Sequence, residues 1–154
     1  MQTITDINNM LKAIVQDHQV LKSFQTFTID TLDMQKLNVT DYPLLYGQCT
    51  GAQINGGDTV LTYEIIVGDL VIEEQQDHIT EIYSETLLLL QDVASQFVFN
   101  MNVGSLVEGN NWSFLLPLNC QPFTARFDNS LTGWSTQFDI KLPNPINLCE
   151  APYG

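Results

Sequence analysis

The sequence predicts an α+β fold, a mainly antiparallel β-sheet with two long helices packed on one face, in a single domain. Apolar residues alternate with other residues from Leu61 to Val67, a period that places one face of a strand on a core. From Ile79 to Phe97 they recur every three or four residues, as in an amphipathic helix. Other strand-like runs cluster around separated helical segments, which favours helices covering an antiparallel sheet.

Composition limits the functional classes. With 154 residues, 44% hydrophobic and 15% charged, the chain is a globular domain rather than a disordered one. Its 18 acidic residues outweigh 5 basic ones, and the net charge of −13 argues against gripping nucleic acid or an anionic membrane surface. Nucleic acid could still pass nearby without sticking, because like charges repel. The longest apolar run, Leu87–Leu90, is too short to cross a bilayer.

The first predicted element is a helix from Ile4 to about Lys22, after a capping-box-like Thr3 and Asp6. His18 falls on the apolar stripe of this helix. We interpret it as a packed or boundary histidine with one satisfied nitrogen, rather than a catalytic residue or ligand, because no partner motif accompanies it.

Two strands are predicted next. The run Phe24–Ile29 predicts a short strand, and Asp30 and Asp33 after it fit a solvated turn better than a calcium site, which needs about six oxygens or more. Leu44–Tyr46 predicts the second strand, and Pro43 before it suits a strand start or a sheet edge.

The turn residues Asn55–Asp58 predict a hairpin between that second strand and a strand over residues 59–71. Asp69 falls on the apolar face of this third strand. One interpretation is a perturbed carboxylate or a salt bridge across an interface. The interpretation we favour is a bulge at Gly68 that turns Asp69 outward.

Asp77 is predicted to be the N-cap of the second long helix, which runs from His78 to about Val98. After it we expect a weak strand over 99–107, a turn, and a further extended run over 112–116.

The C-terminal part of the chain predicts another hairpin. Residues 119–122 are expected to form a loop, followed by a strand over 123–127. The clean alternation of 134–142 predicts its antiparallel partner. Within the single domain 1–154, residues 144–154 are expected to form an extended tail that docks on the body or on a neighbour.

No catalytic signature is present: the sequence lacks nucleophile-elbow, zinc-protease, phosphate-loop and dinucleotide motifs. Two histidines cannot make a three-histidine zinc site. The cysteines Cys49, Cys120 and Cys149 form no CxxC and indicate reduced thiols in a cytoplasm; a Cys49–His78 pair is not marked by any local motif. We therefore predict no enzyme activity, no metal and no cofactor.

Several stretches together resemble a family of tailed-bacteriophage virion proteins. They are His18–Phe24, Tyr42–Tyr46, Tyr63–Val71, Ser84–Val93, Phe123–Phe127, Leu131–Ser135, and the tail with Cys149 and Pro152. The resemblance covers nearly the whole chain in the same order. The element order is similar to that of tail-terminator, or tail-completion, proteins of the phage neck and tail.

The resemblance implies a function in assembly. Such proteins form a hexameric ring that caps the head-proximal end of the tail tube, stops tube polymerisation and joins the tail to the neck. The implied partners are further copies of the chain, the tail tube protein and a neck or connector protein, with no membrane. The implied location is the virion, after assembly in the host cytoplasm. Genomic DNA would pass through an acidic lumen without specific binding.

For subunit contacts we predict the sheet edges and a hairpin over 100–120, and we expect the C-terminal tail to contact a neighbour. The candidate interface residues are Trp112, Trp134, Asp69, Arg126 and Tyr153. Core packing is an equal alternative for both tryptophans. Two other functions stay open: another neck protein such as a connector or stopper, and a small enzyme or ligand-binding domain with an acidic cleft, for which Asp69 would be the candidate carboxylate.

Overall fold

The computed structural model describes residues 4–26, 42–70, 76–102, 117–126 and 131–143. In chain order its elements are α1 (Ile4–Asp17), β1 (Ser23–Gln25), β2 (Leu44–Ile54), β3 (Asp58–Leu70), α2 (Gln76–Asn102), β4 (Cys120–Arg126) and β5 (Leu131–Pro143). The strands form one sheet in the order β1-β2-β3-β5-β4, and only the β1–β2 pair is parallel. The predicted α+β fold is confirmed.

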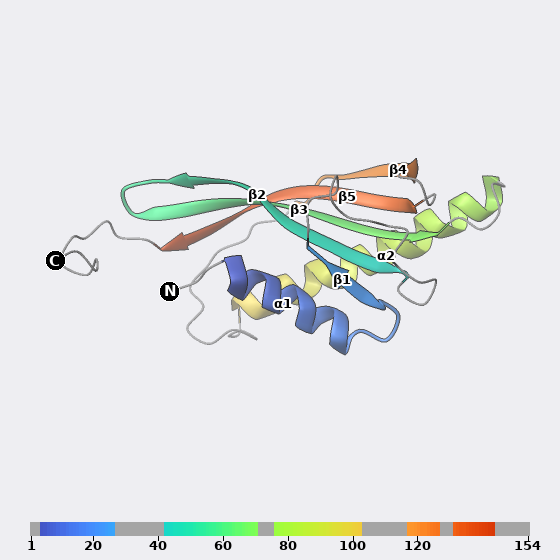
Figure 1. Cartoon of the computed structure of the whole chain (residues 1–154), viewed down its shortest axis with the longest axis horizontal. Helices are drawn as coiled ribbons and strands as arrows, with labels where there is room; N and C mark the ends of the chain where they lie inside the picture. Colours follow the sequence, from blue (N-terminus) through green and yellow to red (C-terminus); the bar gives the residue numbers. More distant parts are fainter. Residues whose placement is uncertain (1–3, 27–41, 71–75, 103–116, 127–130, 144–154) are drawn as a thin grey trace.

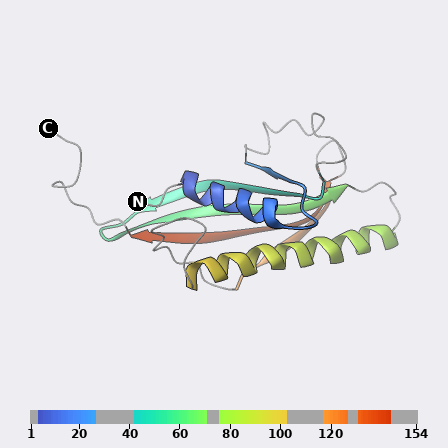
Figure 2. The same ribbon diagram turned by 90° about the horizontal axis from the view of Figure 1, so that it is seen from below.

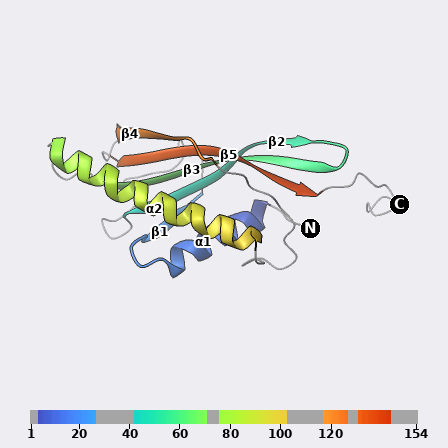
Figure 3. The ribbon, with the colours of Figure 1, turned by 180° about the vertical axis from the view of Figure 1, so that it is seen from behind.

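Both helices cover the same face of the sheet (Figures 1 and 2). Helix α1 packs over β1 and β2, and α2 runs along β3 and β5. Seen from behind, the β2–β3 hairpin and the end of β5 extend beyond both helices (Figure 3). The sheet therefore has a helix-covered body and a projecting three-stranded end.

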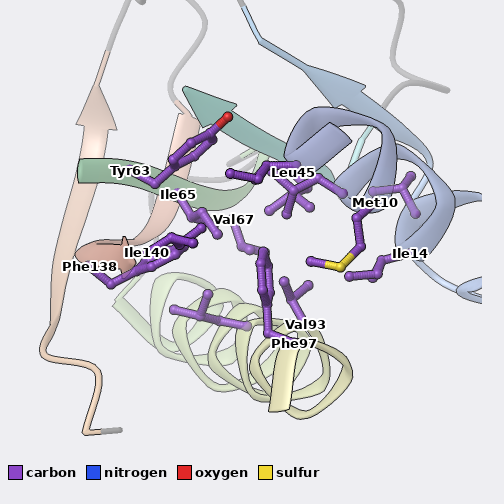
Figure 4. Close-up of a cluster of buried hydrophobic side chains, with 14 of the residues drawn as sticks. Met10, Ile14, Leu45, Tyr63, Ile65, Val67, Val93, Phe97, Phe138 and Ile140 are labelled. Atoms are coloured by element: carbon purple, nitrogen blue, oxygen red, sulfur yellow. The ribbon is translucent and has the colours of Figure 1, made fainter. Parts of the chain in front are cut away.

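The core lies between the helices and the sheet (Figure 4). The alternation predicted for the third strand is confirmed, because its odd residues from Leu61 to Val67 are all buried. Phe97 of α2 packs edge-to-face on Phe138 of β5, with ring centroids 5.7 Å apart. The α1 residues buried against them are Ile7, Met10, Leu11, Ile14 and Val15.

The Tyr63 side chain lies at the end of this core that is next to the first residues of α1. Its hydroxyl donates to Asn8 Oδ1 at 2.9 Å and lies 3.3 Å from the carbonyl oxygen of Ile4. Burial, with a smaller contribution from Cys49, raises the pKa of Tyr63, so the hydroxyl keeps its proton.

The predicted bulge at Gly68 is wrong. Gly68 pairs in unbroken register with Leu44 on one side and Gly133 on the other. A Cβ on Gly133 would lie 2.0 Å from the carbonyl oxygen of Val67, so glycine lets the two strands approach closely here. The irregularity in β2–β3 lies instead between Cys49 and Gly51.

Both helix boundaries differ from the prediction. Helix α1 ends at Asp17, not near Lys22, so His18 lies beyond the helix rather than on its stripe. Helix α2 begins at Gln76, which places Asp77 in its first turn and not at the N-cap. It continues to Asn102, so the start of the predicted strand 99–107 is helical. Tertiary packing and local hydrogen bonds outweigh residue propensity at such ends.

The strands also differ at their ends. The predicted hairpins are confirmed, but β2 is much longer than Leu44–Tyr46, and β3 covers Asp58–Leu70 rather than 59–71. Strand β4 begins at Cys120, where a loop over 119–122 was predicted, because it pairs with Thr136 of β5. The predicted run 112–116 and the tail 144–154 lie outside the described residues.

Candidate functional site

Trp134 ties β5 to α2. Its Nε1 donates to the carbonyl oxygen of Tyr83 at 2.9 Å, and the two rings meet edge-to-face with centroids 5.8 Å apart. The half-buried indole thus packs against the core, as the alternative interpretation proposed. An interface role for its exposed edge stays a prediction.

Two of the other predicted interface residues, Asp69 and Arg126, lie on β3 and β4, the strands on either side of β5. Asp69 is half-exposed on β3, where its carboxylate accepts from the Leu70 amide at 2.8 Å. Arg126 is the last residue of β4 and pairs in register with Leu131. Trp112 and Tyr153 lie outside the described residues. A shared interface for these four residues therefore stays a prediction.

His18 forms a junction between α1 and α2. Its Nδ1 accepts from the amides of Val20 and Leu21 at 3.0 and 3.2 Å. Its Nε2 lies 2.9 Å from Asp92 Oδ2. Because Nδ1 accepts from two amides, Nε2 is the ring nitrogen that donates to the carboxylate. The prediction of a boundary histidine with a satisfied nitrogen is confirmed, and both nitrogens are occupied.

Two hollows flank this histidine, but the ring contacts between them connect the two helices. One, of about 330 Å³, is lined by residues that include Lys12, Lys22 and Phe24; the other, of about 300 Å³, includes Asp17 and Asp92. A general base needs a free lone pair near a nucleophile, and both ring nitrogens of His18 are already used. The His–Asp pair is therefore a junction between helices.

The two cysteines that the structure describes contact backbone carbonyl oxygens. The Cys49 thiol lies 3.3 Å from the carbonyl oxygen of Gly51, and the Cys120 thiol lies 3.8 Å from that of Leu118. No group of three or more potential metal ligands occurs in the described part of the chain. Neither α1 nor α2 contains a stretch with the length and hydropathy that a membrane crossing requires.

The outer face of α2 is acidic. Three carboxylates, Asp77, Glu81 and Glu85, lie exposed along it, a fourth, Asp92, is exposed but bonded to His18, and the helix contains no lysine or arginine. Leu88 is exposed between them. A helix face with one sign of charge favours a solvated or repelling surface over a packed one.

The projecting end of the sheet carries its charged residues, among them Asp58, Asp139 and Lys141, on β3 and β5. Its outer strand, the second half of β2, is exposed from Thr50 to Ile54, and Ile54 has 72% of its surface accessible. The sequence carries no charged residue from Gly47 to Gly57. An uncharged run of this length in so acidic a chain is a sequence signal for a contact surface. The prediction missed that signal, because the strand predicted here ends at Tyr46.

Neither a scan against protein-family models nor a search of curated proteins returns a match.

Proposed function

We propose that this chain is a tailed-bacteriophage virion protein that forms a ring, hexameric by the family resemblance, at the head-proximal end of the tail tube. The ring ends tube polymerisation and joins the tail to the neck. Its task is geometric: one face matches the last tube ring, and the other offers no further tube-like surface. No chemical step is involved.

The observation that carries this proposal is the separation of charged and uncharged surface. The carboxylates of α2 gather on one helix face, whereas the exposed half of β2 is uncharged. Identical subunits with a net charge of −13 repel one another, and a contact surface with few unpaired acids lowers that repulsion. An acidic surface facing DNA repels phosphates and lets the genome slide past, while an uncharged edge can meet a neighbour.

The arrangement at His18 and the cysteines supports an assembly role over an enzyme. The His18–Asp92 pair joins the end of α1 to α2 and leaves no ring nitrogen of His18 for proton transfer. The other histidine–carboxylate pair of the described residues, His78 with Glu81 at 4.0 Å, lies within one turn of α2. The two thiols described contact backbone carbonyls. Nothing in these contacts favours an acidic catalytic cleft around Asp69.

A gene-disruption experiment tests the proposal. Particles made without the chain should carry tails of uncontrolled length that fail to join heads, and a plasmid copy should restore them. A reconstruction of the complete particle should place the chain as one ring on the last tube ring. Normal tails in its absence, or a turnover activity traced to its carboxylates or thiols, would rule the proposal out. A ring against the head portal instead would assign a connector or stopper.

A further inference from the structure

We propose that subunits join through their sheet edges: residues 48–54 of β2, the β2 edge, pair with residues 137–143 of β5, the β5 edge, in a second copy of the chain. The inference rests on the proposed ring function and names its subunit contact. Pairing would join neighbouring sheets through backbone hydrogen bonds, a mode of recognition that adds a strand to an open edge.

Both edges are open among the described residues. Strand β1 pairs only with Leu44–Tyr46 of β2, and the paired residues of β4 extend along β5 only as far as Thr136. Beyond those points β2, β3 and β5 continue as the three-stranded end that projects past the helices (Figures 1 and 3). The β2 edge and the β5 edge are its two sides.

The hairpin closure shows which backbone groups point outward. Asn55 N donates to Asp58 O at 2.8 Å, so this pair is hydrogen-bonded. Partners alternate between bonded and non-bonded pairs along an antiparallel ladder. The next pair, Ile54 with Thr59, is therefore non-bonded, and both Ile54 and Ala52 direct their N–H and C=O groups away from β3.

The same alternation applies on the other side. Asp58 is turned toward β2, so Thr59 bonds to Leu142, and the intervening residues Asp139 and Lys141 direct their backbone groups outward. Each edge thus offers two residues at the same spacing, about 6.6–6.8 Å apart. The two rows can form a short ladder.

The chemistry of the β2 edge favours a partner strand. Natural edges are usually protected by charges, prolines or bulges. Residues 48–54 contain neither charge nor proline, and the irregularity at Thr50 lies before Ala52. The β5 edge carries two charges and Pro143. Asp139 accepts from Thr62 at 2.8 Å and Lys141 lies 3.9 Å from Asp58, whereas Pro143 lies beyond the two residues, Asp139 and Lys141, whose N–H groups point outward.

A second copy is the occupant that this geometry selects. The two edges lie on opposite sides of one sheet, so pairing them is a head-to-tail contact that uses two different patches of each subunit. Such a contact closes into a ring when its rotation permits. It also keeps the acidic outer face of α2 away from the joint, which an acidic chain needs in order to contact itself.

A proline scan of the edge tests the proposal. Ala52→Pro removes an outward N–H while leaving the β2–β3 hydrogen bonds intact, and Ala52→Ser is the control that keeps the N–H. Sedimentation velocity over a wide concentration range should show self-association of the wild type and of Ala52→Ser. Ala52→Pro should weaken it about tenfold or more, the effect of one lost backbone hydrogen bond. Thermal unfolding should show that both variants fold.

Amide exchange of the full chain identifies the surfaces. In the associated wild type, the amides of Ala52, Ile54, Asp139 and Lys141 should slow together. Wild-type chain that is monomeric at every concentration, Ala52→Pro that associates normally, or protection confined to other surfaces would each overturn the proposal. So would protection of the β2 edge that appears only with tube protein. The proposed function fails separately, if purified tails lack the chain.

Discussion

The contact between β3 and β5 at Gly133 gives the sharpest test of the sheet register. A Cβ there would lie 2.0 Å from Val67 O and 2.8 Å from the Cα of Gly68, whereas carbon atoms pack best about 3.5–4.0 Å apart. Both obstacles are backbone, so no side chain can rotate away. We expect Gly133→Ala to cost about 3 kcal/mol, the upper end of measured overpacking. In a domain of this size that lowers Tm by about 6–12 °C.

Two further glycines make the test a graded series. At Gly68 an added Cβ would meet Leu131 Cδ1 at 2.8 Å, Leu131 Cγ at 2.9 Å and the carbonyl oxygen of Thr132 at 3.2 Å. The buried Leu131 side chain can shift only in part, so we expect a cost of about 2 kcal/mol. At Gly51 nothing lies within 4 Å, and we expect a change below about 0.5 kcal/mol. Urea titration of the three alanine variants measures the free energies of unfolding. Equal stability of Gly133→Ala and Gly51→Ala would refute the register.

Three other predictions concern the core and the helix junction. Phe97→Ala should lower the free energy of unfolding, measured by urea titration, by about 3–5 kcal/mol, because the residue is only 1% exposed. A loss below about 1 kcal/mol would contradict the burial of this ring in the core. Burial raises the pKa of Tyr63 above its ordinary 10.0, so the neutral hydroxyl stabilises the fold fully below about pH 10, and that stability is lost as the pH rises further. Tyr63→Phe should therefore lose less stability than the wild type between about pH 8 and pH 11, and equal losses would contradict this. His18→Ala should lower the free energy of unfolding by about 1–2 kcal/mol, because two amide hydrogen bonds are lost. Asp92→Ala should lower it less, because that side chain is 59% exposed, and a double-mutant cycle should give a coupling energy below about 1 kcal/mol. A larger loss for Asp92→Ala than for His18→Ala would contradict the assignment.

The junction at His18 illustrates what propensity misses. The apolar spacing continues through Leu21, which predicts a helix to about Lys22, but the helix ends at Asp17. The ring of His18 accepts the amides of Val20 and Leu21, which a continuing helix would have bonded to its own carbonyls. Only the folded chain shows that Asp92, far along the sequence, completes this arrangement.

The candidate contact surface was predictable only in outline. The sequence predicts sheet edges as contacts and contains the uncharged run Gly47–Gly57. It gives no sign that β2 continues to Ile54, because residues 47–53 lack the alternation that marks a strand. Pairing with β3 holds this segment extended, and that partner comes from tertiary structure.

Local periodicity determined the α+β class and the residues of the main core, because an element that buries one face repeats its apolar residues every 2 or about 3.6 positions. Periodicity together with turn residues determined the two hairpins. Tertiary structure decided where helices stop, how the strands are ordered and which backbone groups stay open. Those features depend on partners distant in sequence: Asp92 for His18, Gly133 for Gly68, and the short reach of β1 and β4 for the exposed edges. No local pattern encodes such pairings, since each is fixed only when the separate elements pack together.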